Sequence, residues 1–284
     1  MKLFIFCVQI VFFVNAFSSY PIATGERDHE RLQILNELYN PSTLSLLELK
    51  PNIRVLTIGC GIALLEVELA RQIGPASSIL ATDVSSDQLI IAKHHAEMAG
   101  VSNLSFMQLD IDKIDSLPGQ FDRIHCRFVL SHLILEKVYT AIPRLYNLLA
   151  PGGILLLEEI ETLDSLACEP LNQAYEKWKD LVFTQFAIGG GDCSPGRKIK
   201  DFLHAKGYAA TFSFYQPTLY TAREKSILSL GVESVKEKLL TAQAISQTEI
   251  DEIMIGLKEI ENNPLVLPQY CETRQVILRR PNVL

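Results

Sequence analysis

A turn of two glycines one residue apart, Gly59-Cys60-Gly61, directly follows the apolar run 54–58. Where a strand leads into a helix, such a turn lets the backbone approach a ligand closely and points N–H groups at it. The next apolar run ends at Asp83, where a carboxylate can accept both hydroxyl groups of a ribose. The glycines alone could serve only to turn the chain, but together with Asp83 they predict a nucleotide-like ligand.

Polar side chains also follow the third and fourth apolar runs. The carboxylate of Asp110 can take the exocyclic amine of an adenine while the N–H of Ile111 meets a ring nitrogen, and a solvated loop acid is the alternative. Arg127 can meet the same ligand and Phe128 can form a wall of its pocket, because the carboxyl ends of parallel strands line the ligand crevice. The residues expected at this ligand are Gly59, Cys60, Gly61, Asp83, Val84, Asp110, Ile111 and Arg127.

These residues can lie close together only if short strands alternate with longer helices and bring them to one edge of a parallel sheet. The chain has this rhythm, which is typical of repeated βαβ units. Strands are expected at 54–58, 78–82, 104–108, 121–126 and 154–158, and helices at 64–73, 86–99 and 135–149. Because the strands are apolar throughout, both faces of the sheet should be buried. The predicted fold is α/β: a doubly wound, mostly parallel, Rossmann-like sheet with helices on both faces.

The flanking segments are expected to complete the sheet and to cover the site. Arg27 to Leu49 has helical spacing, which Asn40-Pro41 is expected to break into two short helices. Further helices are expected at 166–186, 197–206 and, as a pair, 222–262, with strands at 210–214 and 274–280. The two strands would make the sheet seven-stranded, and the helical pair and the N-terminal helices would form a lid. The predicted parts are a hydrophobic leader at 1–17, a lid segment at 18–50, a ligand-binding core at 51–160 and a C-terminal part at 161–284.

Over residues 50–160 the chain resembles the class I S-adenosylmethionine-dependent methyltransferases. The matching segments are VLTIGCGIALLEVELA, ILATDVSSDQLIIAK, FMQLDI, FDRIHCRFVLSHL and LAPGGILLLEE. Residues 20–32 and 264–281 are similar to a bacterial small-molecule branch of the family. The resemblance implies that Gly59 and Gly61 hold the methionine part of S-adenosylmethionine. It also implies that Asp83 binds the ribose and that Asp110 contacts the adenine.

Two positions depart from the family pattern. Thr57 stands where the family usually has an acid, and Ile62-Ala63 stand where it usually has a small residue and a third glycine. Ala63 adds only a methyl group at a close approach, whereas Ile62 is bulkier. Since these changes could narrow the pocket or weaken binding, an inactive binding or regulatory protein on the same fold is one alternative.

The activity that the resemblance implies is transfer of the methyl group to a small-molecule acceptor. The sulfonium donor is already activated, so the protein mainly has to align acceptor, methyl and sulfur. A base is needed only if the acceptor keeps its proton near pH 7. Weak candidates for a catalytic role are His132, Glu159 with its neighbour Glu158, and Tyr39 in the lid, and each of them has a structural interpretation as well.

Other classes of ligand fit the sequence less well. A nicotinamide-dependent oxidoreductase would also use the glycine turn and Asp83, but its fingerprint needs a third glycine where Leu64 stands. The net charge of −7 and the lack of a basic stripe argue against nucleic acid. No Cys/His cluster has the spacing of a zinc site, so no metal is expected.

The first residues carry a signal of their own. Residues 3–14 are nearly all apolar, follow Lys2 and precede Val14-Asn15-Ala16, in which small residues have the spacing of a signal-peptidase site. The run is too short to span a bilayer, so it indicates a signal peptide or an extra hydrophobic leader rather than a stable anchor. S-adenosylmethionine is made and kept inside cells, and six scattered cysteines suggest reduced thiols. We therefore expect a cytoplasmic protein, with export or membrane association through the leader as the alternative.

Overall fold

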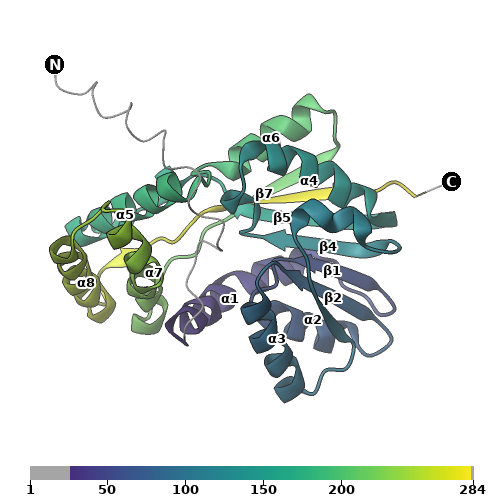
Figure 1. The fold of residues 1–284 in the computed structure, drawn as a ribbon, viewed down its shortest axis with the longest axis horizontal. Coiled ribbons are helices and arrows are strands. Elements are labelled where there is room, and N and C mark those ends of the chain that lie inside the picture. Colours follow the sequence, from purple (N-terminus) through teal and green to yellow (C-terminus); the bar gives the residue numbers. More distant parts are fainter. Residues whose placement is uncertain (1–25, 283–284) are drawn as a thin grey trace.

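The computed structural model describes residues 26–282, and the predicted leader lies outside this range. Its centre is a seven-stranded sheet in the order β3-β2-β1-β4-β5-β9-β7 (Figure 1). The pairings among β1 to β5 are parallel, while β9 runs antiparallel to both β5 and β7. The strands are β1 (Arg54–Ile58), β2 (Ser78–Asp83), β3 (Leu104–Gln108), β4 (Phe121–Arg127), β5 (Leu149–Ile160), β7 (Ala210–Tyr215) and β9 (Thr273–Arg279). The predicted doubly wound, mostly parallel, seven-stranded sheet is confirmed.

Both faces of the sheet are buried by helices, as alternation along the apolar strands requires. In β5, Leu155 and Leu157 share one buried cluster with α4 and α6, whereas Ile154 and Leu156 share another with α2. Figure 1 shows α4 and α6 on one side of the sheet and α2 and α3 on the other. These helices are α2 (Leu64–Ile73), α3 (Ser86–Ala99), α4 (Leu135–Asn147) and α6 (Pro195–Ala205).

A third group of helices packs beside the sheet (Figure 1), and the C-terminal part of its first helix also packs on the sheet. We call it the helical layer; it consists of α1 (Glu26–Leu46), α5 (Gln173–Gly189), α7 (Ala222–Thr241) and α8 (Gln247–Asn262). Its buried core includes Tyr39, Trp178, Leu228 and Leu257, one from each helix. Two short strands, β6 (Cys168–Glu169) and β8 (Leu267–Pro268), pair with each other. In the sequence β6 precedes α5, and β8 follows α8. The predicted strand–hairpin–strand order at the C-terminal side is thus confirmed, with α7 and α8 between β7 and β9.

Three expected boundaries were wrong. The helix α1 runs unbroken through Pro41, because burial of Ile34, Leu38 and Tyr39 offsets the hydrogen bond that proline removes. The helix expected at 166–186 begins instead at Gln173, after Pro170, where Asn172 caps it by accepting the N–H groups of the next turn. The strand expected at 154–158 spans Leu149–Ile160, so it begins five residues earlier and both Glu158 and Glu159 lie inside it.

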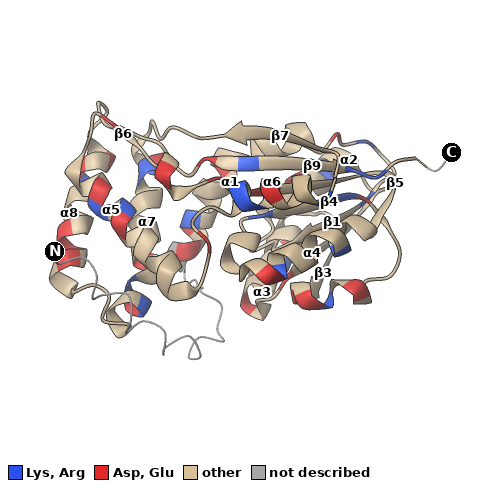
Figure 2. Ribbon diagram, turned by 90° about the horizontal axis from the view of Figure 1, so that it is seen from above, with Lys and Arg blue, Asp and Glu red and all other residues tan. Residues whose placement is uncertain are grey.

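Charged residues are dispersed over the described surface. In Figure 2 acidic and basic residues lie close together on the helical layer, where Lys177 of α5 pairs with Glu252 of α8 at 2.9 Å. Such exposed pairs contribute at most about 1 kcal/mol each. Between residues 26 and 282 no helix combines the length and the apolarity that crossing a membrane requires.

Candidate functional site

The glycine turn leaves β1 in a left-handed backbone conformation. The φ angle is +72° at Gly59, +53° at Gly61 and +59° at Ala63. The N–H groups of Gly59 and Cys60 both donate to the carbonyl of Thr82, at 2.8 and 2.9 Å, which ties the turn to the end of β2. Glycine adopts this conformation freely, whereas alanine at 63 carries a cost of about 1–2 kcal/mol.

Alanine substitutions at the two glycines should lower the stability of the protein by different amounts. A Cβ at Gly59 would lie 2.2 Å from Cγ2 of Val129, whereas a Cβ at Gly61 would meet nothing within 4 Å. Gly61→Ala should therefore cost only the left-handed strain, about 1–2 kcal/mol, and Gly59→Ala about 1–3 kcal/mol more from overpacking. Urea denaturation of both variants measures the difference. Equal losses would mean that Val129 moves aside freely.

Asp83 joins the glycine turn to the following helix. Its Oδ2 accepts the N–H of Gly61 at 2.9 Å, and its Oδ1 accepts the N–H of Ser85 at 2.9 Å. The side chain is buried, and this burial raises its pKa while the backbone N–H groups act in the opposite direction. Ser85 rather than Asp83 caps α3, through Gln88. A carboxylate offers about four acceptor positions, so these hydrogen bonds leave part of the capacity of Asp83 unused.

The other residues expected at the nucleotide end lie at the same edge. Leu109 donates its N–H to the carbonyl of Asp83 at 2.9 Å, which brings the loops after β2 and β3 together. Val84 is half exposed, Asp110 is exposed and Ile111 is buried. Asp110 caps the short helix η2 (Ile111–Ser116) by accepting the N–H of Asp112. Its side chain therefore has a local structural role as well as access to solvent.

Arg127, at the end of β4, is bound by α1. Its guanidinium donates to the side-chain oxygens of Asn36, Asn40 and Thr43 at 2.8 to 2.9 Å. These three residues follow the i, i+4, i+7 spacing of one helix face. Sequence reasoning missed them because it broke the helix at Pro41; the spacing of three polar residues was the available signal. Arg127 thus fixes α1 over the end of β4.

Glu158 is the centre of a buried polar network. Its Oε2 accepts from Thr43 Oγ1 at 2.6 Å and from His125 Nε2 at 2.8 Å, and its Oε1 accepts from Gln275 at 2.8 Å. Burial acts to raise the pKa of Glu158, but the hydrogen bonds and the charges of His125 and Arg127 outweigh it and lower the pKa. Burial lowers the pKa of His125. Glu158 thus joins α1, β4 and β9 to its own strand.

The three weak catalytic candidates differ in how far they are engaged. Glu159 accepts the N–H groups of Val129, Leu130 and Ser131, so it anchors the turn after β4, and burial raises its pKa to about 7. The Tyr39 hydroxyl donates to the carbonyl of Cys271 at 2.5 Å, and burial raises its pKa well above 10. His132, in the short helix η3 (Leu130–His132), stacks on Phe186 with ring centres 5.9 Å apart. Burial, aided by the charges of Arg31 and Lys238, lowers its pKa to about 4, so the ring is neutral at pH 7.

One acidic residue of the site was not found from the sequence. Glu66 lies in the first turn of α2, is only 2% exposed, and has a pKa that burial raises to about 7. The Thr57 hydroxyl lies beside this carboxyl and helps to lower its pKa, yet it makes no hydrogen bond of ordinary length and angle. Burial raises the pKa of the neighbouring Cys60 thiol, and the charges of Glu66 and Asp83 raise it further. The available signal was an acid inside the apolar run LLEVELA.

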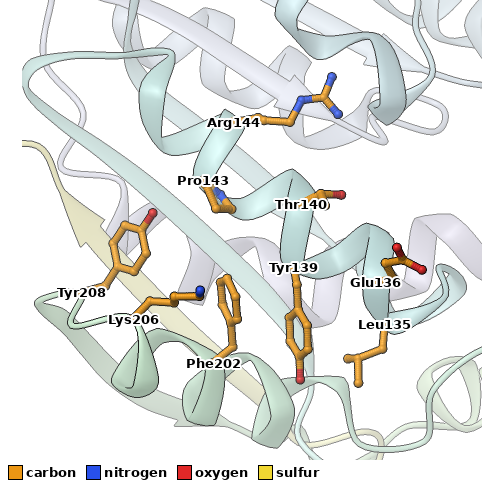
Figure 3. A pocket seen from close by; sticks show the side chains of 9 residues that line it. All are labelled: Leu135, Glu136, Tyr139, Thr140, Pro143, Arg144, Phe202, Lys206 and Tyr208. Atoms are coloured by element: carbon orange, nitrogen blue, oxygen red, sulfur yellow. The ribbon is translucent and has the colours of Figure 1, made fainter.

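A groove of about 940 Å³ lies elsewhere, on the outer side of α4 and α6. Figure 3 shows the side chains that line it, among them Tyr139 of α4 and Phe202 of α6. Their rings stack with centres 4.5 Å apart. None of the residues expected at the ligand lines this groove. Among residues 26–282, no cluster of His, Cys, Asp and Glu is arranged to hold a metal ion.

The chain shares its core with known methyltransferases. Residues 55–153 match a family model described as a methyltransferase domain. Over 122 residues the chain is 36% identical to methyltransferase str3 of Strobilurus tenacellus, a match that covers 43% of this chain and 39% of that protein. Over 145 residues it is 28% identical to the ubiquinone/menaquinone biosynthesis C-methyltransferase UbiE of Pseudomonas paraeruginosa, covering 51% of this chain and 55% of that one. The chain thus spans about half the length, or less, of these relatives.

The fold is shared over a longer stretch. The structure of coclaurine N-methyltransferase bound to N-methylheliamine and S-adenosylhomocysteine superposes with a TM-score of 0.52 at 15% identity, covering 87% of this chain and 71% of that one. At that identity the likeness concerns the fold alone. The family match of residues 55–153 and the strand order agree with it. Residues 55–153 thus carry a methyltransferase domain, on the fold that the coclaurine N-methyltransferase structure shares.

Proposed function

We propose that this protein binds S-adenosylmethionine at the carboxyl edge of the sheet and transfers its methyl group to a small-molecule acceptor. The observation that carries the proposal is the hydrogen bond between Asp83 and the glycine turn, in which the Asp83 carboxylate accepts the N–H of Gly61 at 2.9 Å. The relatives named as methyltransferases support it. So does the neighbour of the same fold whose structure holds S-adenosylhomocysteine.

The described residues fit this cofactor. The space over Gly61 is open, since a Cβ there would meet no atom within 4 Å. Asp83 has acceptor capacity left for the ribose hydroxyls. Asp110 is exposed next to the buried Ile111, where an adenine amine and a ring nitrogen could be met. The bulky Ile62 is buried and only 1% exposed, so its side chain lies in the protein interior.

The chemistry that S-adenosylmethionine supplies is an activated methyl group, which bonds to the acceptor atom as its bond to sulfur breaks. The chain's own contribution is alignment, which can supply about 7–11 kcal/mol in well-positioned reactions. Arg127 and its partners on α1 hold that helix over the edge of β4, where the acceptor would enter. The helical layer supports an enclosed, small acceptor rather than a polymer.

If the acceptor loses a proton, His132 is the residue best placed to take it. Glu159 accepts three backbone N–H groups and the Tyr39 hydroxyl donates to a carbonyl, so both side chains are engaged in holding the fold. The neutral ring of His132 can accept one, and its low pKa makes it a weak base.

Titration calorimetry of the full chain with S-adenosylmethionine and S-adenosylhomocysteine tests the proposal. Asp83→Ala should weaken binding by about 5- to 150-fold, because about 1–3 kcal/mol is the usual cost of a lost buried polar partner. Asp87→Ala removes an exposed acid from the first turn of α3 and should leave the dissociation constant unchanged. Thermal unfolding checks that each variant is folded.

Absence of binding by the folded wild type would refute the proposal. Binding without transfer of labelled methyl to a panel of phenols and amines would instead favour a binding or regulatory protein on this fold.

A further inference from the structure

Glu66 is a buried acid whose charge has no direct counter-ion among the described residues. It lies 2% exposed in the first turn of α2, just after the glycine turn. The described ion pairs, which bring a nitrogen within 4.0 Å of a carboxylate, do not include it. Burying a carboxylate without such a partner is costly, so a site of this kind suits a cationic ligand.

The surroundings of Glu66 belong to the proposed cofactor site. The charge of Glu66 raises the pKa of Cys60 in the glycine turn. The charge of Asp83 in turn raises the pKa of Glu66, and that of Arg127 lowers it. Arg127 is close enough to attract it, but its guanidinium donors go to α1. The hydroxyl of Thr57, at the end of β1, is buried beside Glu66 and has no hydrogen-bond partner. The carboxyl of Glu66 and the hydroxyl of Thr57 thus have unused hydrogen-bonding capacity next to the glycine turn.

S-adenosylmethionine carries two positive groups. The sulfonium has no hydrogen to donate, whereas the α-ammonium of the methionine part donates up to three hydrogen bonds, as a lysine ammonium does. A carboxylate and a hydroxyl side by side can accept two of them, and charge-assisted hydrogen bonds of this kind are about twice as strong as neutral ones.

We propose that Glu66, with Thr57 beside it, receives the α-ammonium of the methionine part of the cofactor. This assignment rests on the proposed function and makes it specific. The carboxylate that binds the ammonium then comes from Glu66 in the first turn of α2, because β1 carries threonine at position 57. The N-terminus of α2 also favours a negative charge at Glu66.

Calorimetry with two ligands tests the assignment. S-adenosylhomocysteine has the ammonium, whereas 5′-methylthioadenosine has the same nucleoside but lacks the amino-acid end. Glu66→Gln should weaken binding of S-adenosylhomocysteine about 10- to 100-fold and leave binding of 5′-methylthioadenosine unchanged. The matched control is Glu68→Gln, which makes the same change on the same helix and should affect neither ligand. Thr57→Val should show the same discrimination, with a smaller loss.

A pH series adds a second readout. Because the ammonium binds the ionised carboxyl, the affinity of wild type for S-adenosylhomocysteine should rise between pH 6 and pH 8, and this rise should vanish in Glu66→Gln. Equal affinities of wild type and Glu66→Gln, or an equal loss for both ligands, overturn the assignment while the proposed function stands. If folded wild type binds neither ligand, both fail.

Discussion

Replacing Glu158 by alanine is expected to lower the free energy of unfolding by about 3–5 kcal/mol, the usual cost of removing one partner from a buried ionic network. The carboxylate accepts from Thr43, His125 and Gln275, which come from α1, β4 and β9. Its removal leaves His125 without its acceptor, takes one of two acceptors each from Thr43 and Gln275, and opens a cavity within the sheet. No other single side chain described above joins so many elements.

Urea denaturation at pH 7 measures the loss. Glu97→Ala, which removes an exposed acid from α3, is the control and should change stability by at most about 0.5 kcal/mol. Glu158→Gln should be milder than the alanine variant, since an amide oxygen still accepts one of the donors. A loss below about 1 kcal/mol in Glu158→Ala would show that water or rearranged side chains satisfy these donors.

Glu66→Gln is expected to make the ligand-free protein more stable at pH 8 than the wild type, by up to about 3 kcal/mol. The pKa of Glu66 is about 7 in the folded protein, against an ordinary value of 4.5. Between these values the folded state binds the proton that the unfolded state has lost. The contribution of this carboxyl to stability therefore falls as the pH rises from about 4.5 through 7 and is lowest above 7. Glutamine does not titrate and removes this dependence.

The measurement is the free energy of unfolding of both proteins at pH 5 and at pH 8. The stabilisation by glutamine should be small at pH 5 and large at pH 8, and Glu68→Gln should show no such growth. Glu159 titrates in the same direction in both proteins, so its effect cancels in the difference. A difference that is the same at both pH values would mean that Glu66 is ionised, or neutral, throughout the range.

Where local sequence decides the structure, prediction from sequence succeeded. The helices α2 and α3 and the strand β3 have the expected bounds, because a glycine turn, the cap Ser85 and Gly100 mark their ends within a few residues. The sheet followed from the alternation of apolar strands with helices. The turn chemistry at Gly59 and Gly61 could be predicted for the same reason, since left-handed backbone needs glycine whatever lies around it.

Where distant parts of the chain decide, sequence reasoning failed. Pro41 is an ordinary helix breaker, and burial of α1 against the other helices of the helical layer offsets its effect. The partners of Arg127 lie more than eighty residues away from it, on that same helix. Glu66 reads as one acid in an amphipathic helix until the fold places it beside Thr57. Contacts of this kind have no periodicity and can be found only in three dimensions.

The position of β9 between β5 and β7 also constrains how the chain can be made and shortened. During synthesis, β5 and β7 are complete before residues 273–279 exist, and neither has its shared neighbour. Both strands then present open edges, and such edges are the surfaces by which nascent chains associate wrongly. The helices α7 and α8 are made in this interval, so the helical layer can assemble while the sheet is still open. A chain that stops before Thr273 would keep those edges and be prone to aggregate, although every residue expected at the cofactor would be present.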